Sequence, residues 1–217
     1  MDEWIGNGSG QHEGAGYVTN EKAHRGQYSW KAVQNSSFPP PFDKPAKLLR
    51  WRFDYKEAYF SAWYFWPSIF NVTGRGNEYV NIFQWLERNK PWGPTWIIAV
   101  MKSYQSPGKD ELVVHNAKNN LVIRKGIILP KEKWFNLQAF MKTEFCCEGK
   151  LIVYLDGQEI FNLPNINTSG SPTNTTGFLM WGVGNYSASG SGEFFYIDDT
   201  VVSARKVMDP PRNLVIK

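Results

Sequence analysis

Cysteine is scarce in this chain of 217 residues, where only Cys146 and Cys147 occur and stand side by side. A disulfide between adjacent residues closes a strained ring, so we expect the pair not to form a stabilising bridge. The spacing of paired Cys-x-x-Cys motifs is absent, which excludes the usual zinc sites. Cysteine usage therefore leaves the redox compartment undecided.

Long apolar runs are also missing. No stretch is long enough to span a membrane, and Met1 is not followed by a charged and then apolar leader. We therefore expect a soluble protein without a membrane partner. Triplets of the form Asn-x-Ser/Thr, which a secretory pathway can glycosylate, favour a secreted, extracellular protein. They begin at Asn7, Asn35, Asn71, Asn167, Asn174 and Asn185.

Dense positive charge is lacking as well. The 24 Lys and Arg against 20 Asp and Glu give a net charge of +4, and their scatter in ones and twos argues against a nucleic-acid partner. The small excess favours an acidic partner. Nucleotide-binding loops, Gly-x-Ser-x-Gly elbows, His-Glu-x-x-His helices and the carboxylate runs of retaining glucanases do not occur, which excludes the enzymes that carry these signatures.

No segment has the periodicity of an amphipathic helix. Alternating segments between turn residues indicate about a dozen strands, typical of two packed antiparallel sheets. The predicted fold is all-β, a β-sandwich jelly roll in one domain over residues 17–207. The glycine-rich residues 1–16 are expected to be a flexible segment, and residues 208–217 a tail. The predicted strands are Tyr28–Val33, Leu48–Tyr55, Tyr59–Trp66, Tyr79–Leu86, Thr95–Met101, Glu111–His115, Leu121–Lys125, Trp134–Cys147, Leu151–Leu155, Gln158–Phe161, Phe178–Gly182 and Glu193–Val202.

Aromatic residues are abundant by contrast, at 16% of the chain. Trp and Tyr rings left over from a core suit sugar rings as well as protein partners. The strand predicted at Tyr79–Leu86 combines aromatic with amide side chains. Strict alternation places Gln84 on one face of this strand and Asn81 on the other, together with Phe83 and Trp85. Gln84 is then either buried and hydrogen-bonded or open on a concave surface.

Several parts of the sequence together resemble a known family. They are Trp63-Tyr64-Phe65-Trp66-Pro67 followed by Phe83-Gln84-Trp85, the hairpin Gly149–Gly157, and Phe178–Tyr186 with Tyr196-Ile197-Asp198-Asp199. These motifs resemble jelly-roll polysaccharide lyases of the heparin lyase I and alginate lyase type, within the concanavalin A-like lectin/glucanase superfamily. The resemblance covers most of residues 17–203.

This resemblance implies cleavage of an acidic, uronate-containing polysaccharide by β-elimination, without a cofactor for catalysis. In such lyases an arginine-bearing strand, a Gln-x-His strand and a late tyrosine meet in a cleft. Arg50, Gln84 and Tyr186 match them as catalytic residues. Arg50 or Arg52 and Gln84 would neutralise the substrate carboxylate, and Tyr186 would carry a proton. The residues expected to bind substrate are Arg52, Trp85, Trp92, Asn81 and Lys90.

The sequence departs from the family motif at Leu86, which stands where the family has histidine. A lyase would then use Tyr186 alone or recruit His24 or His115 from elsewhere in the chain. Gln84 also has a structural interpretation, as a satisfied polar group in a sheet. His115 has one too, as a structural histidine on a short strand.

Asp198 is the candidate metal ligand. The resemblance implies that a late aspartate helps to hold a structural calcium ion against residues near the N-terminus, where Asp2, Glu3 or Glu13 would supply partners. The alternative is a hydrogen bond that closes a loop. Two other functions also fit the sequence, a non-catalytic, lectin-like carbohydrate-binding module and a structural or adhesion protein on a jelly-roll scaffold.

Overall fold

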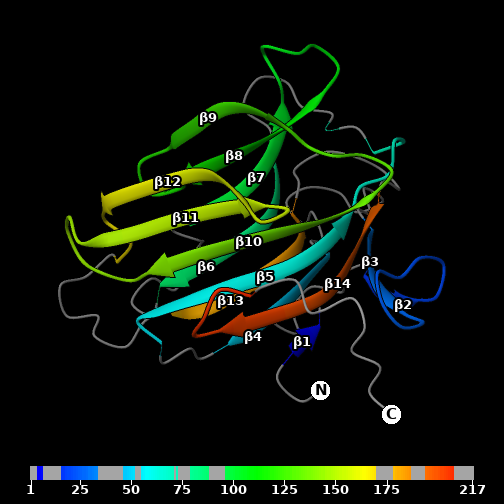
Figure 1. The fold of residues 1–217 in the computed structure, drawn as a ribbon, viewed down its shortest axis with the longest axis horizontal. Helices are drawn as coiled ribbons and strands as arrows, with labels where there is room; N and C mark the ends of the chain where they lie inside the picture. The colour runs from blue at the N-terminus through cyan, green and yellow to red at the C-terminus, as the bar shows by residue number, and fades with distance from the viewer. Residues whose placement is uncertain are drawn as a thin grey trace, which may run out of the picture.

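The computed structural model describes residues 4–6, 16–33, 46–51, 55–70, 72, 79–87, 96–169, 178–186 and 194–207. Every regular element in these ranges is a β-strand, and the strands form two seven-stranded sheets packed face to face (Figure 1). Hydrogen-bonded neighbours run antiparallel throughout both sheets. The predicted all-β sandwich of two antiparallel sheets is confirmed. In the described ranges, no helix is long and apolar enough to cross a membrane.

Both sheets combine strands that are distant in the sequence. Sheet A has the order β1 (Trp4–Gly6), β4 (Ala46–Trp51), β13 (Phe178–Tyr186), β6 (Val80–Glu87), β7 (Trp96–Lys102), β8 (Asp110–Asn116) and β9 (Leu121–Ile128). Sheet B has the order β12 (Gln158–Ile166), β11 (Gly149–Leu155), β10 (Trp134–Lys142), β5 (Glu57–Phe65), β14 (Phe194–Ser203), β3 (Ser29–Val33) and β2 (Tyr17–Thr19).

Some strand boundaries differ from the predicted ones. β1 lies within the segment expected to be flexible and pairs with β4 at the edge of sheet A. β13 runs on to Tyr186, which the sequence places in a loop, because Tyr186 pairs with Asn81. β10 ends at Lys142 and not at Cys147. Beyond Lys142 the chain leaves the ladder, since the Glu144 N–H bonds to the Thr168 hydroxyl oxygen at 2.8 Å.

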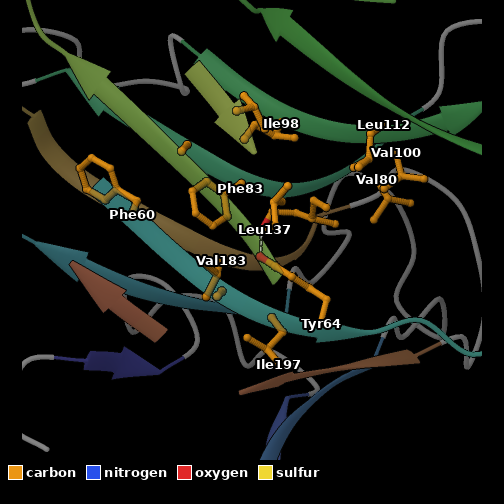
Figure 2. Close-up of a cluster of buried hydrophobic side chains, with 14 of the residues drawn as sticks. Phe60, Tyr64, Val80, Phe83, Ile98, Val100, Leu112, Leu137, Val183 and Ile197 are labelled. Carbon is orange, nitrogen blue, oxygen red and sulfur yellow. Dashed lines mark hydrogen bonds between the residues drawn. The ribbon is translucent and has the colours of Figure 1, made fainter. Parts of the chain in front are cut away.

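Aromatic side chains from both sheets meet in the core between them. Trp85 of β6 and Trp181 of β13 pack on Phe60 of β5, with ring centroids 5.5 and 5.3 Å apart. Phe83 contacts both tryptophans, and Figure 2 shows Phe60 and Phe83 among the buried side chains. Burial of one such side chain contributes about 1.5 to 3 kcal/mol. The core therefore uses much of the aromatic surplus.

A β-bulge interrupts the alternation of β6. Asn81 pairs with Ala99 and Phe83 pairs with Ile98, so Ile82 is the extra residue on β6. Ile82 and Phe83 are both fully buried in the core. The bulge therefore shifts the phase of the strand by one residue.

The bulge is tied to the opposite sheet. Neither β7 nor β13, both described over their full length, offers Ile82 a register partner. Its carbonyl oxygen instead accepts a 2.7 Å hydrogen bond from the hydroxyl of Tyr64, on β5 (Figure 2). This bond replaces the ladder contact that the bulge removes.

Candidate functional site

The bulge brings two amide side chains onto one face of sheet A. Asn81 pairs with Ala99 and Gln84 pairs with Ile97, and these partners belong to an apolar cluster separate from the main core. The Asn81 Nδ2 donates a 2.6 Å hydrogen bond to the Gln84 Oε1. The prediction that Asn81 and Gln84 lie on opposite faces is wrong. Gln84 is buried and hydrogen-bonded, the first of the two alternatives that the sequence leaves open.

Gln84 belongs to a row of residues that crosses the outer face of sheet A, the face turned away from the core. The row consists of Gly182 on β13, Gln84 on β6, Ile97 on β7 and His115 on β8, and we call it the Gln84 row. Side chains directly opposite one another on antiparallel strands share a face. The Cα atoms of Gln84 and His115 lie on the order of 10 Å apart, two interstrand spacings.

His115 is an unusual member of this row. Its side chain is 5% exposed, and neither ring nitrogen has a hydrogen-bond partner among the described residues. The ring packs edge-on against Tyr79, with centroids 4.9 Å apart. Burial lowers the pKa of His115, and the side chain of Asn120 opposes this shift. The imidazole is therefore neutral near pH 7, with a nitrogen lone pair available to accept a proton.

The rest of this face is apolar beside the row and charged farther along β8. Ile97, Ala99, Met101 and Val113 form the buried apolar cluster. Beyond it, the Glu111 Oε2 pairs with the Arg124 guanidinium at 3.1 Å. The outer face of sheet A therefore places neutral amides and an imidazole beside an apolar floor, with the ion pair at one end.

Tyr186 lies next to the amide pair in the sheet. Its backbone ends β13 and is the register partner of Asn81. Three residues expected to bind substrate, Arg52, Lys90 and Trp92, lie outside the described residues. The structure therefore brings the chain positions of Tyr186, Asn81 and Gln84 together.

Arg50 and Trp85 are placed differently from Gln84. Arg50 is the register partner of Trp181, whereas Gly182 of the Gln84 row pairs with Leu49. In the register of the sheet, Arg50 is therefore offset by one residue from the Gln84 row. Trp85 pairs with Trp181 and is fully buried in the core, and not on a surface where it would contact substrate.

His24 lies on the other sheet. Its ring stacks on Trp63 of β5 with centroids 3.7 Å apart, and its Nδ1 is 2.8 Å from the Asp199 Oδ2 on β14. Trp63 alternates with core residues and so faces away from the sandwich interior. The hydrophobic core separates His24 from the Gln84 row. Of the two histidines that the sequence offers, His115 is the one that shares a face with Gln84.

The Asp198 carboxylate closes a loop. Its Oδ2 accepts the backbone N–H groups of His24 and Arg25 at 2.9 and 3.3 Å, and its Oδ1 accepts that of Asp199 at 2.8 Å. Calcium needs oxygen ligands, and these oxygens already accept N–H groups. The part of the chain that the structure describes contains no group of three His, Cys, Asp or Glu side chains that could hold a metal ion. Asp198 thus makes the loop-closing hydrogen bonds of the alternative interpretation, whereas Asp2, Glu3 and Glu13, the expected calcium partners, lie outside the described residues, so the calcium site stays a prediction.

The sequence contains a signal that Asn81 and Gln84 lie on the same face of β6. Ile82 and Phe83 are consecutive large apolar residues in a strand that otherwise alternates. A phase change between them puts every large apolar residue from Val80 to Trp85 in the core and both amides outside. The pairing of β8 with β7, which brings His115 into the row, has no such signal.

Comparison with known proteins gives matches only among solved structures, since no family model and no curated protein matches the chain. An endo-β-1,4-glucuronan lyase from the fungus Trichoderma reesei is 14% identical, with a TM-score of 0.63 over 89% of each chain. The cellulose-induced protein Cip1 is 15% identical, with a TM-score of 0.65 over 94% of this chain and 93% of its own.

A third similar structure contains a bound sugar. It is a mutant of the alginate lyase Aly36B in complex with an alginate trisaccharide, 10% identical, with a TM-score of 0.58 over 93% of this chain and 98% of its own. At these identities the likeness concerns the fold alone. The chain described above therefore has the jelly-roll β-sandwich fold of glucuronan and alginate lyases.

Proposed function

We propose that this protein is a polysaccharide lyase that cleaves a uronate-containing glycan by β-elimination on the outer face of sheet A. The observation that carries the proposal is the buried Asn81–Gln84 pair at the centre of that sheet. The fold supports it, because similar solved structures include a glucuronan lyase and an alginate lyase with an alginate trisaccharide.

The amide pair suits the chemistry of β-elimination. Removal of the proton next to the uronate carboxylate builds negative charge on that group, and hydrogen-bond donors that are already in position stabilise this charge. The hydrogen bond from Asn81 to the Gln84 Oε1 orients the amide of Gln84, and in this proposal its Nε2 is the donor that binds the carboxylate. A carboxylate that reaches this buried position is desolvated, which strengthens the interaction.

The remaining parts of the proposal follow from the same reaction. Tyr186, whose backbone pairs with Asn81, carries a proton to the departing sugar. The substrate is an acidic polysaccharide, in keeping with the net charge of +4. An extracellular location belongs to the proposal, because the Asn-x-Ser/Thr triplets favour a secreted protein.

The test is to incubate the protein with polyglucuronate, alginate and heparin and to follow the ultraviolet absorbance of the unsaturated uronate product. We expect absorbance to rise with at least one polymer. Gln84→Ala should lower kcat by about 100-fold or more, the usual loss of an oxyanion-stabilising donor. Gln138→Ala is the matched control, because Gln138 is equally buried but lies on sheet B, where it donates to the Val207 carbonyl.

The outcomes separate the candidate functions. Equal losses of turnover in the two variants would mean that Gln84 acts only through stability. Binding of the polymers without any rise in absorbance would contradict the lyase proposal and assign the non-catalytic, lectin-like function. Absence of both binding and turnover would favour a structural or adhesion protein.

A further inference from the structure

We propose that His115 is the catalytic base of this lyase, supplied by β8 and not by the position two residues after Gln84. The proposal rests on the proposed lyase function and adds the residue that removes the proton. It is carried by the position of the imidazole in the Gln84 row and by its two ring nitrogens, neither of which makes a hydrogen bond of normal geometry with a described residue.

The Gln84 row fixes the relative positions of the Gln84 amide and the His115 imidazole. Gln84 and His115 project from the same face of sheet A on either side of Ile97, which is 1% exposed. In the proposed binding mode a uronate lies along the row, with its carboxylate at the Gln84 amide and its neighbouring carbon toward β8. The sheet itself sets this geometry, because both side chains come from regular strands in one register.

The state of His115 suits a base. Buried polar atoms in folded proteins almost always have hydrogen-bond partners, so exceptions call for a functional explanation. A structural histidine in this position would donate to a carbonyl or carboxylate, as His24 does with Asp199. His115 instead packs against the ring of Tyr79, and neither ring nitrogen makes a hydrogen bond of normal geometry with a described residue, although the side chain of Asn120 acts on the ring.

The reaction balances without a further reactant. The imidazole nitrogen takes the proton from the carbon that bears the carboxylate, and the electron pair of that C–H bond becomes the new C=C bond. The bond from the next carbon to the glycosidic oxygen breaks with its electron pair. The departing oxygen takes a proton from the Tyr186 hydroxyl, and the imidazolium returns its proton to the tyrosinate through water. No atom is oxidised or reduced, and no water is consumed.

Among the described residues few charged groups face this imidazole, and the polar group that opposes the effect of burial on its pKa is the neutral side chain of Asn120. On its own strand Glu111 faces the same side, and on β9 Arg124 does, but these two pair with each other at 3.1 Å. The described side chains of β6 and β7 on this face are the amides of Asn81 and Gln84 and apolar side chains. Burial is therefore the main influence on the proton affinity of His115, and it lowers its pKa.

The experiment compares His115→Ala with His24→Gln in the polyglucuronate and alginate assays. We expect His115→Ala to lower kcat by about 100-fold or more and exogenous imidazole to restore part of the rate. His24→Gln should keep the wild-type rate. In the wild type, kcat/KM should rise with pH through a midpoint below the ordinary histidine pKa of about 6.5, and this limb should disappear in His115→Ala.

Histidine NMR gives a second measurement. The chain has only three histidines, so the labelled rings can be assigned from His24→Gln and His12→Gln, because the ring signal of His115 is the one that both variants keep. Oligoglucuronate should shift the ring signal of His115 and leave that of His24 in place. This readout uses the wild-type protein and holds even when His115→Ala does not fold.

The outcomes distinguish this inference from the proposed function. If the wild type cleaves the polymers and Gln84→Ala does not, a His115→Ala variant with wild-type kcat and an unchanged pH profile overturns the assignment of His115 alone. An unchanged His115 ring signal at saturating oligoglucuronate does the same. If the wild type cleaves none of the polymers, the lyase function itself fails, and the role of His115 fails with it.

Discussion

The hydrogen bond from Tyr64 to the Ile82 carbonyl links the core to the shape of the candidate site, and Tyr64→Phe tests that link. The substitution keeps the ring and removes only the donor of the 2.7 Å bond. The carbonyl at the bulge then loses its partner in the interior. Leaving a buried polar group unsatisfied costs about 1 to 3 kcal/mol of unfolding free energy.

That loss can be measured by thermal and denaturant unfolding. For a domain of this size, 1 kcal/mol corresponds to about 2 to 4 °C in Tm, so we expect a decrease of roughly 2 to 12 °C. Tyr28→Phe is the matched control, because it removes a hydroxyl from a side chain that is 58% exposed. The control should leave Tm nearly unchanged.

The pH dependence of the same pair of proteins gives a second check. Burial raises the pKa of Tyr64 well above its ordinary value. A raised pKa in the folded state contributes stability that is fully present below the unfolded pKa of about 10 and is lost as pH rises above it. Tyr64→Phe lacks this contribution, so its deficit relative to the wild type should shrink above about pH 10. A deficit equal to that of Tyr28→Phe, or one that stays constant above that pH, would refute the reasoning.

Three further predictions concern the framework around the site. Gly149→Ala should lower the unfolding free energy by about 1 to 3 kcal/mol in denaturant titrations, because the added Cβ would lie 2.5 Å from the Ile166 carbonyl oxygen; unchanged stability would contradict this packing. Asp198→Ala should cost about 1 to 2 kcal/mol by freeing three backbone N–H groups, whereas EDTA should not shift the wild-type Tm, and a shift would support a calcium role. The Cys147 thiol raises the pKa of Cys146, so Cys147→Ala should move alkylation of Cys146 to lower pH; an unchanged profile would exclude this coupling.

The sequence by itself determined the fold class and most of the strands. Alternation of apolar and polar residues is a local property, and turn residues such as Asp156-Gly157 end strands wherever they occur. The pattern therefore predicts β5, β6 and β11 closely. It also identifies Gln84, because an amide among large apolar residues is visible without any knowledge of the partners.

The tertiary structure decided which residues meet, because the consecutive apolar residues Ile82 and Phe83 signal a phase change in the strand but not which strands pair with it. Strict alternation separates Asn81 from Gln84, and only the bulge at Ile82, anchored by Tyr64 from the other sheet, brings them together. The choice between His24 and His115 likewise depends on which strands pair across long stretches of chain. Register between distant strands follows from packing of the whole core and not from local pattern. For that reason the sequence leaves both histidines open, and the fold places only His115 beside Gln84.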